Sequence, residues 1–581
     1  MKNKHSLPKT TKKSKKATFF EGSKYTTQVK TVFVVILLFF LYSVFKNISY
    51  PLFWADESMT VVGAQRVLEF GYPKVHDGKN VFYDLRHSNP ELGIDIETDA
   101  YIGGTSWLHY YYGAIGVSLA KTTNDIYVKT GIIRVTFAIA GIIGLLFLGY
   151  SVTIFFNSLF NKLLFISIYT LILSYSVSLT LLLREARYYP LAIGLSCLVV
   201  AVYFFIKYGN NRFLLYKCIC LSILLLLLFH AFFVLYFIFV TVLLLSEIYT
   251  YMKERNNTYF NAFKKMSPVM ATLLSTVAIV IPCISYFKIF YISKAMAEFN
   301  GYNSKMYWDN FYTLLKYITH FEFGWIYIIS CVIMLFNYSK LRKCNDRLLD
   351  ISVFAFLFLI VFSFLIPRIP NFLFSRYYIY MLPVFAVGLI CNIFLLFQLF
   401  KEENNVWNFK KKLLVAMLVV FLSITLWENK PYLSGHIYEL QEPYKGVLDY
   451  TIPYILDNNN RTDTLVVATN YEETSFMYYL NAKVAVGFVG NNLKQDSLLV
   501  PDIISYRKAW GNFPNVFNIF VKKNQYKRVS FPVKDYPVNN IPELDFVLNH
   551  QFKTLIQNPY LLMMRKRRRI FIPRLINLRL F

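Results

Sequence analysis

Long apolar runs are the feature that most limits what this chain can fold into. A helix that crosses a bilayer needs about 20 consecutive, mainly apolar residues. The run 214–250 is too long for one helix of ordinary tilt, so we divide it at His230. The sequence thereby predicts a polytopic α-helical membrane protein with about eleven spans, at 31–47, 131–154, 163–183, 188–206, 214–229, 231–250, 267–290, 323–338, 349–366, 377–400 and 412–427.

The charges indicate which loops share a side of the membrane. The chain carries a formal net charge of +27. If residues 1–30 lie in the cytoplasm and the spans alternate, the predicted cytoplasmic segments hold 25 basic and five acidic residues. The first outer loop, 48–130, holds six basic and ten acidic residues. This bias follows the positive-inside rule. It accounts for most of the surplus without a nucleic-acid partner.

The same rule sets the organisation of the chain. A further span at 106–121 would invert the later loops, so we expect 106–120 to form a helix at the outer interface. The predicted parts are a basic cytoplasmic tail (1–30), a membrane domain (31–430), an extracytoplasmic domain (431–564) and a basic tail (565–581). The last tail, which opens Arg565-Lys-Arg-Arg-Arg569, is expected to be solvated or to face lipid headgroups.

The region after residue 430 changes to short alternating elements. Helices are predicted at 444–457 and 472–480, and strands at 463–469, 483–489, 515–523 and 526–531. Such alternation is typical of a small α/β domain. All seven cysteines precede residue 392, so neither disulfides nor a cysteine-based zinc site stabilises this domain.

Two adjacent acids open the first outer loop. Asp56 and Glu57 follow Trp54, within about ten residues of the end of the first span. Carboxylates this close to a membrane are costly unless they are solvated, paired or used in function. The position favours a functional pair over the alternative, the solvated start of a loop.

Arginines occur where the positive-inside rule disfavours them, at predicted outer ends of spans. Arg184 and Arg187 stand at i and i+3, and we expect them to share a helix face. A guanidinium fork binds phosphate well. A structural ion pair of these arginines with Glu57 or Glu185 is equally compatible with the pattern. Arg368 and Arg376, the latter followed by Tyr377, lie at another outer end.

Two further residues are candidates for substrate contact. His230 lies at the outer apex of two apolar helices, and Arg134 lies near the start of the second span. A lone histidine there is more often structural. Together with the acids, the arginines suggest one chemistry: a carboxylate acts as general base on an acceptor hydroxyl, while guanidinium groups stabilise a phosphate leaving group.

The order of these motifs resembles a known family. Asp56-Glu57, Arg184-x-x-Arg187-Tyr188-Tyr189 and Arg376-Tyr377 resemble the GT-C superfamily of integral-membrane glycosyltransferases, of the glycosyltransferase family 39 type, over about residues 30–400. Relatives of that type include protein O-mannosyltransferases and the lipid A aminoarabinose transferase. The segment Trp107-Leu-His109-Tyr110 matches the family's first loop but lacks the His-Pro-Pro or Lys-Pro element of many relatives.

The resemblance implies inverting transfer of a sugar from a polyprenyl-phosphate donor on the extracytoplasmic face of a bacterial inner membrane. Asp56 would be the base, supported by Glu57. The donor phosphate would contact Arg184, Arg187, Arg376 and Tyr377. His109, Arg134, His230 and Arg368 would contact substrate. The acceptor (lipid, glycan or protein), the sugar and any divalent metal stay open. We expect the outer domain to shape acceptor access and to hold no catalytic group.

Two other functions were weighed. A transporter or flippase for a lipid-linked anion needs paired charges deep within the spans, along a pathway. The predicted spans hold few charged residues near their centres. A sensor or scaffold would use the outer domain to bind a partner, but this leaves the outer arginines without a role.

Overall fold

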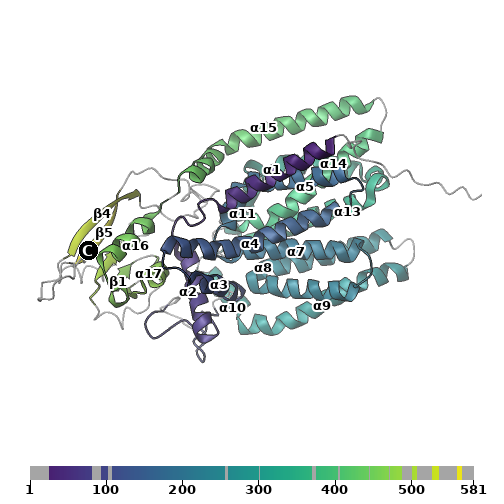
Figure 1. The fold of residues 1–581 in the computed structure, drawn as a ribbon. Helices are drawn as coiled ribbons and strands as arrows, with labels where there is room; N and C mark the ends of the chain where they lie inside the picture. Colours follow the sequence, from purple (N-terminus) through teal and green to yellow (C-terminus); the bar gives the residue numbers. More distant parts are fainter. Residues whose placement is uncertain are drawn as a thin grey trace, which may run out of the picture.

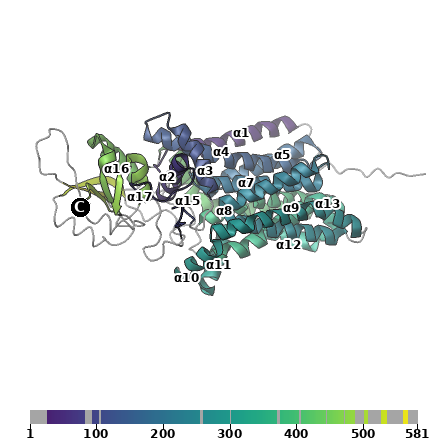
Figure 2. The same cartoon turned by 90° about the horizontal axis from the view of Figure 1, so that it is seen from below.

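The computed structural model describes residues 25–81, 93–102, 107–254, 259–299, 301–369, 375–402, 406–443, 445–469, 472–486, 500–506, 526–534 and 559–565. A helical bundle forms one part and an α/β domain near the C-terminus forms the other (Figure 1). Between them lie two helices of the first loop, α2 (Ala55–Phe70) and α3 (Leu108–Ala120), as the perpendicular view also shows (Figure 2).

Apolar helices of different lengths make up most of the described chain. They are α1 (Thr26–Phe45), α4 (Ile126–Thr153), α5 (Leu159–Tyr175), α6 (Val177–Leu183), α7 (Tyr188–Tyr208), α8 (Leu214–Glu254), α9 (Tyr259–Tyr286), α12 (Gly324–Phe336), α13 (Tyr338–Leu365), α14 (Leu382–Glu402) and α15 (Val406–Gln441). In the described part of the chain, seven helices are long and apolar enough to cross a membrane, or up to nine if each bent pair is one span. This confirms a multi-pass helical protein. Each of the eleven predicted segments overlaps a helix, and the number eleven stays a prediction.

Helix α8 reverses direction near its middle. Phe232 has non-helical backbone angles (φ −156°, ψ 95°). Lys217 in the first half donates to the Phe205 carbonyl at 3.3 Å, and Glu247 in the second half accepts from Tyr203 at 2.7 Å. Both halves therefore meet the same end of α7, which requires them to run antiparallel. The predicted division at His230 is confirmed to within two residues.

Two other helices are sharply bent, and their bends meet. The α5–α6 pair turns by 80° and the pair α11 (Ser304–His320)–α12 turns by 92°. At the junction, Ser176 donates to the Glu322 carboxyl at 2.8 Å and Tyr317 donates to it at 3.2 Å. The segment predicted as a span at 163–183 is thus a helix pair broken at Ser176, whose hydroxyl caps α6 by accepting from the Leu179 amide.

The two ends of the bundle differ in charge pattern. Lys207 pairs with Glu247 at 3.3 Å, and Lys253 with Asp350 at 2.6 Å, all at the C-terminal end of α7. Tyr188 begins α7 at the other end, about 31 Å away by helix rise. The start of α1 lies at the end away from the α/β domain (Figure 1). Described residues of three predicted cytoplasmic segments, Lys207, Lys253 and Arg342, thus lie at one end, and which end faces the cytoplasm stays a prediction.

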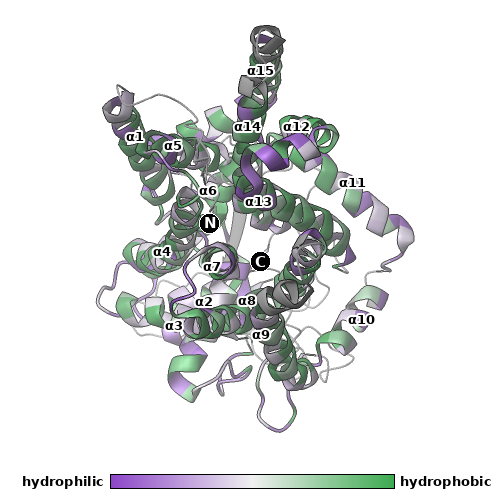
Figure 3. Cartoon of the chain, turned by 90° about the vertical axis from the view of Figure 1, so that its right-hand side faces the viewer, coloured by the Kyte–Doolittle hydropathy of each residue, from purple (hydrophilic) through white to green (hydrophobic). Residues whose placement is uncertain are grey.

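Helix α3 confirms the helix predicted over 106–120, of which the structure describes residues 107–120. Tyr111, Ile115 and Leu119 form an exposed row at four-residue spacing, while the opposite side packs on α2 and α4. An exposed apolar row suits the predicted interfacial position. Amphipathic α10 (Ile289–Phe299) and α11 lie at the edge of the bundle, and the long helix α15 lies at another side of it, in contact with α14 (Figure 3).

The C-terminal domain is an α/β unit with a mixed sheet in the order β2-β1-β3-β5-β4. Its elements are α16 (Val447–Asn458), β1 (Val466–Thr469), α17 (Glu473–Leu480), β2 (Lys483–Val486), β3 (Ile503–Ser505), β4 (Tyr526–Lys534) and β5 (Pro559–Arg565). Strands β1, β2 and β3 are parallel, and β5 is antiparallel to β3 and β4.

Helix α15 continues past residue 431, the expected domain start. The predicted strand 515–523 lies outside the described residues.

Candidate active site

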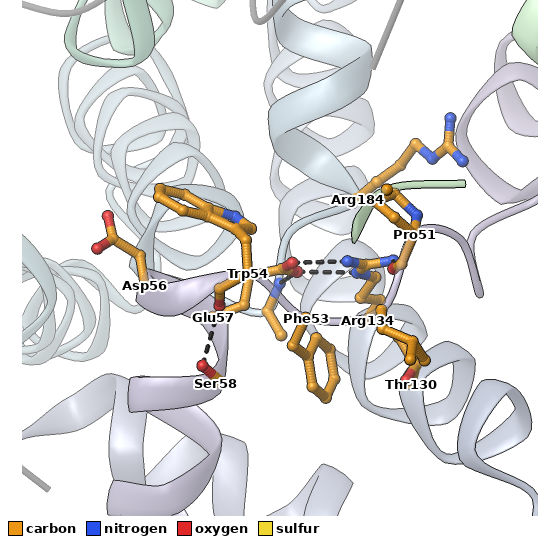
Figure 4. Close-up of polar contacts among 12 residues, drawn as sticks. Pro51, Phe53, Trp54, Asp56, Glu57, Ser58, Thr130, Arg134 and Arg184 are labelled. Carbon is orange, nitrogen blue, oxygen red and sulfur yellow. Dashed lines mark hydrogen bonds and ion pairs between the residues drawn. The ribbon is translucent and has the colours of Figure 1, made fainter. Parts of the chain in front are cut away.

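The first turn of α2 carries the two candidate acids. Trp54 precedes the helix with an extended backbone, and Asp56 and Glu57 follow within the first turn. The positive end of a helix dipole favours carboxylates at this place. Successive helical residues point about 100° apart. The two side chains leave the turn on different sides (Figure 4), so they meet different partners.

Glu57 is held in a buried, bidentate ion pair. Arg134 of α4 donates from Nε to Oε1 at 2.8 Å and from Nη2 to Oε2 at 2.6 Å. The Ala186 amide also donates to Oε1 at 2.8 Å. The third guanidinium nitrogen, Nη1, donates to the carbonyls of Ile48 and Pro51 at 3.0 and 2.6 Å (Figure 4). Glu57 and Arg134 therefore fasten the end of the first span to α4 and α2.

Asp56 has a more open environment. Its side chain is 28% exposed, and Arg376 Nη1 lies 3.1 Å from Oδ2. Arg376 belongs to the 3-10 turn η4 (Ser375–Tyr377). Arg187 donates from Nη1 to the Asp56 backbone carbonyl at 3.0 Å and to the Thr60 hydroxyl at 3.1 Å. A partly exposed carboxylate thus lies beside two guanidinium groups that come from distant parts of the chain.

Aromatic rings surround the Arg376 guanidinium. Its carbon lies 5.6 Å from the Trp54 ring centroid, 6.0 Å from that of Tyr189 and 5.5 Å from that of Tyr377. Cation–π contacts of this kind attract a guanidinium to the ring faces. The side chain is only 10% exposed. These rings fix the charge beside Asp56 and limit its contact with water.

Further rings connect this cluster to the reversal in α8. The Phe232 ring stacks on Tyr188 at 5.4 Å and on Tyr377 at 6.2 Å, and it meets Tyr380 at 5.3 Å. Buried His109 of α3 lies 5.9 Å from Tyr188. The turn between the two halves of α8 therefore packs against the tyrosine rings next to Arg376.

Glu185 is a buried carboxyl group within the same cluster. It is 2% exposed, and neither carboxyl oxygen has a hydrogen-bond partner among the described residues. Burial raises its pKa well above the usual value, and the negative charges of Glu57 and Asp56 add to this shift against the opposing charge of Arg376. Burial therefore disfavours the charged form of Glu185, which lies beside two paired carboxylates.

The structure separates Arg184 from Arg187. Residues 184–187 form a non-helical link between α6 and α7, so the expectation that these arginines share a helix face was wrong. Arg184 turns away from Asp56 (Figure 4). It donates to the Asn47 carbonyl at 2.8 Å and lies 3.5 Å from Glu439 of α15. Only Arg187 reaches the backbone that carries Asp56.

Some of the other predicted residues contact the group formed by Asp56, Arg187 and Arg376, and some lie away from it. Tyr377 contacts Arg376, and Arg134 binds Glu57. His109 packs on Tyr110 at 4.0 Å. His230 lies against Phe287 and 4.0 Å from the Cys283 sulfur, and none of its described contacts involves Asp56. Arg368 is exposed at the end of the 3-10 turn η3 (Ile366–Arg368).

Sequence reasoning missed three kinds of contact at this site. Trp54, which precedes the two acids, faces Arg376. Tyr189 contributes a second ring face. The residues Asp449, Ser475 and Tyr479 of the C-terminal domain bind the segment before α2. Only the Tyr188-Tyr189 pair carried a signal, through its place beside Arg187.

The described residues offer no group of three or more His, Cys, Asp or Glu side chains that could hold a metal ion. Both Glu57 oxygens are bound by Arg134. What the arrangement offers chemically is a proton acceptor, Asp56, next to positive charges that suit an anion.

Comparisons with known proteins come from structure alone. No family model and no curated protein matches the sequence. Among solved structures, ArnT from Cupriavidus metallidurans in the apo state is similar, with TM-score 0.47, 10% identity and coverage of 93% of this chain and 98% of that one. The same protein bound to undecaprenyl phosphate gives TM-score 0.43, 10% identity and equal coverage. The Archaeoglobus fulgidus oligosaccharyltransferase tethered to an acceptor peptide has a TM-score of 0.45 and 10% identity, and the match covers 88% of this chain and 69% of that one. This is a distant similarity of fold, and no residue role is taken from it.

Proposed function

We propose that this membrane protein is a glycosyltransferase that moves a sugar from a polyprenyl-phosphate donor to an acceptor hydroxyl, with inversion. The observation that carries the proposal is the contact between Asp56 and Arg376, with Arg187 on the adjoining backbone. It joins a general base to an anion-binding group at the end of an apolar bundle, where a lipid-linked phosphate can approach from the membrane.

The proposed reaction is a single displacement. The acceptor oxygen bonds to the anomeric carbon while Asp56 takes its proton. The bond from that carbon to the phosphate oxygen breaks, and its electron pair stays on the polyprenyl phosphate. Arg376 and Arg187 stabilise the charge that develops there. One displacement by an acceptor, without a covalent enzyme intermediate, inverts the anomeric centre.

The binding of the donor would change the partner of Arg376. In the present structure its Nη1 faces Asp56. A phosphodiester at the same place competes for the guanidinium, which prefers a bidentate oxyanion. Asp56 is then released to accept a proton. The proposed place of action is the extracytoplasmic face of a bacterial inner membrane, with a lipid, glycan or protein as acceptor.

The test compares wild-type protein with Asp56→Asn in membranes supplied with polyprenyl-phosphate hexoses and pentoses. Mass spectrometry should detect polyprenyl phosphate release and a heavier acceptor only with the wild type. Loss of a general base typically costs about 10²- to 10⁴-fold in rate. Asp309→Asn is the matched control, because Asp309 is exposed on α11. Full activity of Asp56→Asn would contradict the assignment of the base.

A transporter predicts a different result in the same preparation. Reconstituted protein would move a labelled lipid-linked anion across liposomes without making a glycosidic bond. The described ion pairs Lys207–Glu247 and Asp56–Arg376 lie at opposite ends of the bundle. They do not form a chain of charges through it, which is why we favour transfer.

A further inference from the structure

The extended segment before α2 is held by side chains of the C-terminal domain. The Phe53 amide donates to the Tyr479 hydroxyl at 3.0 Å, and the Phe53 carbonyl accepts from the Ser475 hydroxyl at 2.9 Å. The Leu52 amide donates to the Asp449 carboxyl at 3.1 Å. These residues come from α16 and α17, about 400 positions later in the chain. Three backbone polar groups of two adjacent residues thus find their partners in another domain.

The same helix α17 also binds the first turn of α2. The Ser58 hydroxyl lies 2.7 Å from that of Thr474 and 2.9 Å from that of Ser475. Thr474 donates to the Ala55 carbonyl at 3.3 Å. Ser58, Thr474 and Ser475 are all buried. The hydrogen bonds of α17 therefore lie on both sides of Asp56 in sequence.

Tyr479 connects the segment before α2 to α4. Its hydroxyl lies 2.7 Å from the Thr130 hydroxyl, which itself donates to the Ile126 carbonyl at 2.7 Å. Because Thr130 uses its only proton there, Tyr479 must donate to Thr130 while it accepts from Phe53. Thr130 lies one turn before Arg134 in α4, and Arg134 holds Glu57. A chain of hydrogen bonds through Tyr479 and Thr130 therefore connects the Phe53 amide to α4.

We propose that α17 positions the Asp56 carboxylate, with Ser475 and Tyr479 as positioning residues that act through the Phe53 backbone. The inference rests on the proposed function, in which Asp56 is the base, and gives the C-terminal domain a part in turnover besides acceptor access. Reacting groups tolerate little displacement, and an error of 1 Å costs about 10²-fold in rate. The guanidinium groups that would bind the donor come from other elements, since Arg187 precedes α7 and Arg376 lies in η4.

The test uses the full-length protein with Tyr479→Phe and, separately, Ser475→Ala. We expect kcat to fall by about 10- to 100-fold, while the KM for the polyprenyl-phosphate donor stays within about threefold. Tyr478→Phe is the matched control: Tyr478 is the neighbouring residue of α17, and none of its described contacts is a hydrogen bond to the first loop. Tyr479→Phe leaves the buried Phe53 amide without its partner, so its midpoint of unfolding in detergent should be lower than that of Tyr478→Phe, and kcat is measured below both midpoints.

A second measurement is independent of activity. Hydrogen exchange of the amides in 52–58 should be faster in Tyr479→Phe than in Tyr478→Phe, with no change in α7. If the wild type transfers sugar but both α17 variants keep its kcat, the inference is overturned. If the wild type transfers no sugar from any donor, the proposed function fails instead, and unchanged exchange in 52–58 would overturn the positioning contact by itself.

Discussion

Arg134 holds both carboxylate oxygens of Glu57, at 2.8 and 2.6 Å, and neither side chain is more than 5% exposed. The neighbouring acid, Asp56, has a single 3.1 Å contact with Arg376 and keeps 28% of its side chain exposed. Two adjacent carboxylates therefore differ in environment: Glu57 is buried and holds three elements together, and Asp56 is partly exposed.

Glu57→Gln should reduce stability more than it changes chemistry at Asp56. It leaves the Arg134 charge buried without its partner, which typically costs about 3–5 kcal/mol. Chemical unfolding in detergent should show this loss. The double variant Glu57→Gln/Arg134→Met should recover part of it, because no unpaired charge is left. A wild-type unfolding free energy in Glu57→Gln would show that the pair contributes nothing to the fold.

The sequence predicted the membrane helices well because their signal is local. An apolar run of about 20 residues needs no knowledge of its neighbours, and all eleven segments overlap helices. The reversal in α8 followed from length alone. The break at Ser176 was not predicted. A serine within an apolar run does not by itself indicate a helix cap, and the hydrogen bond from the Leu179 amide is seen only in the structure.

The site was predicted only in part because its contacts are long-range. Asp56, Arg187 and Arg376 converge, as the sequence suggested for acids and arginines at one end of the spans. Spacing could not tell that Arg184 turns toward Glu439 while Arg187 turns toward Asp56. The role of Ser475 and Tyr479 depends on the docking of a domain more than 400 residues away.

Arg376→Lys should weaken donor binding even though the charge is kept. Lysine lacks the planar fork that faces an oxyanion bidentately and stacks on the rings of Trp54 and Tyr189. We expect the donor KM to rise by about tenfold, equivalent to about 1.4 kcal/mol. Arg212→Lys is the control, since Arg212 is exposed between α7 and α8. Equal KM values for the two variants would remove Arg376 from the donor site.

Arg184→Gln and Arg187→Gln should have different effects. Arg184 binds the Asn47 carbonyl and faces Glu439, so its loss should lower the unfolding free energy by about 1–3 kcal/mol with little change in donor KM. Arg187→Gln should raise the donor KM, because its guanidinium lies beside Asp56. Measuring both quantities for both variants separates the roles. A raised KM in Arg184→Gln alone would restore the original assignment of this residue to the donor phosphate.

Glu185 should make the fold more stable at low pH than at high pH. Burial is the main cause that raises its folded-state pKa above the usual 4.5, so the folded protein binds more protons than the unfolded chain between these two values. This contribution is fully present below about pH 4.5 and is lost as the pH rises through the folded-state pKa, at about 1.4 kcal/mol per pKa unit.

Glu185→Gln keeps a side chain of similar shape and removes the titration. Unfolding free energies in detergent, measured from pH 5 to pH 8, should fall less steeply for Glu185→Gln than for the wild type. Glu298→Gln is the control, because Glu298 is exposed in α10 and should leave the slope unchanged. If the unfolding free energy has the same pH dependence in the wild type and in Glu185→Gln, Glu185 is ionised in the folded protein. The group of side chains around Asp56 and Arg376 then contains an additional negative charge.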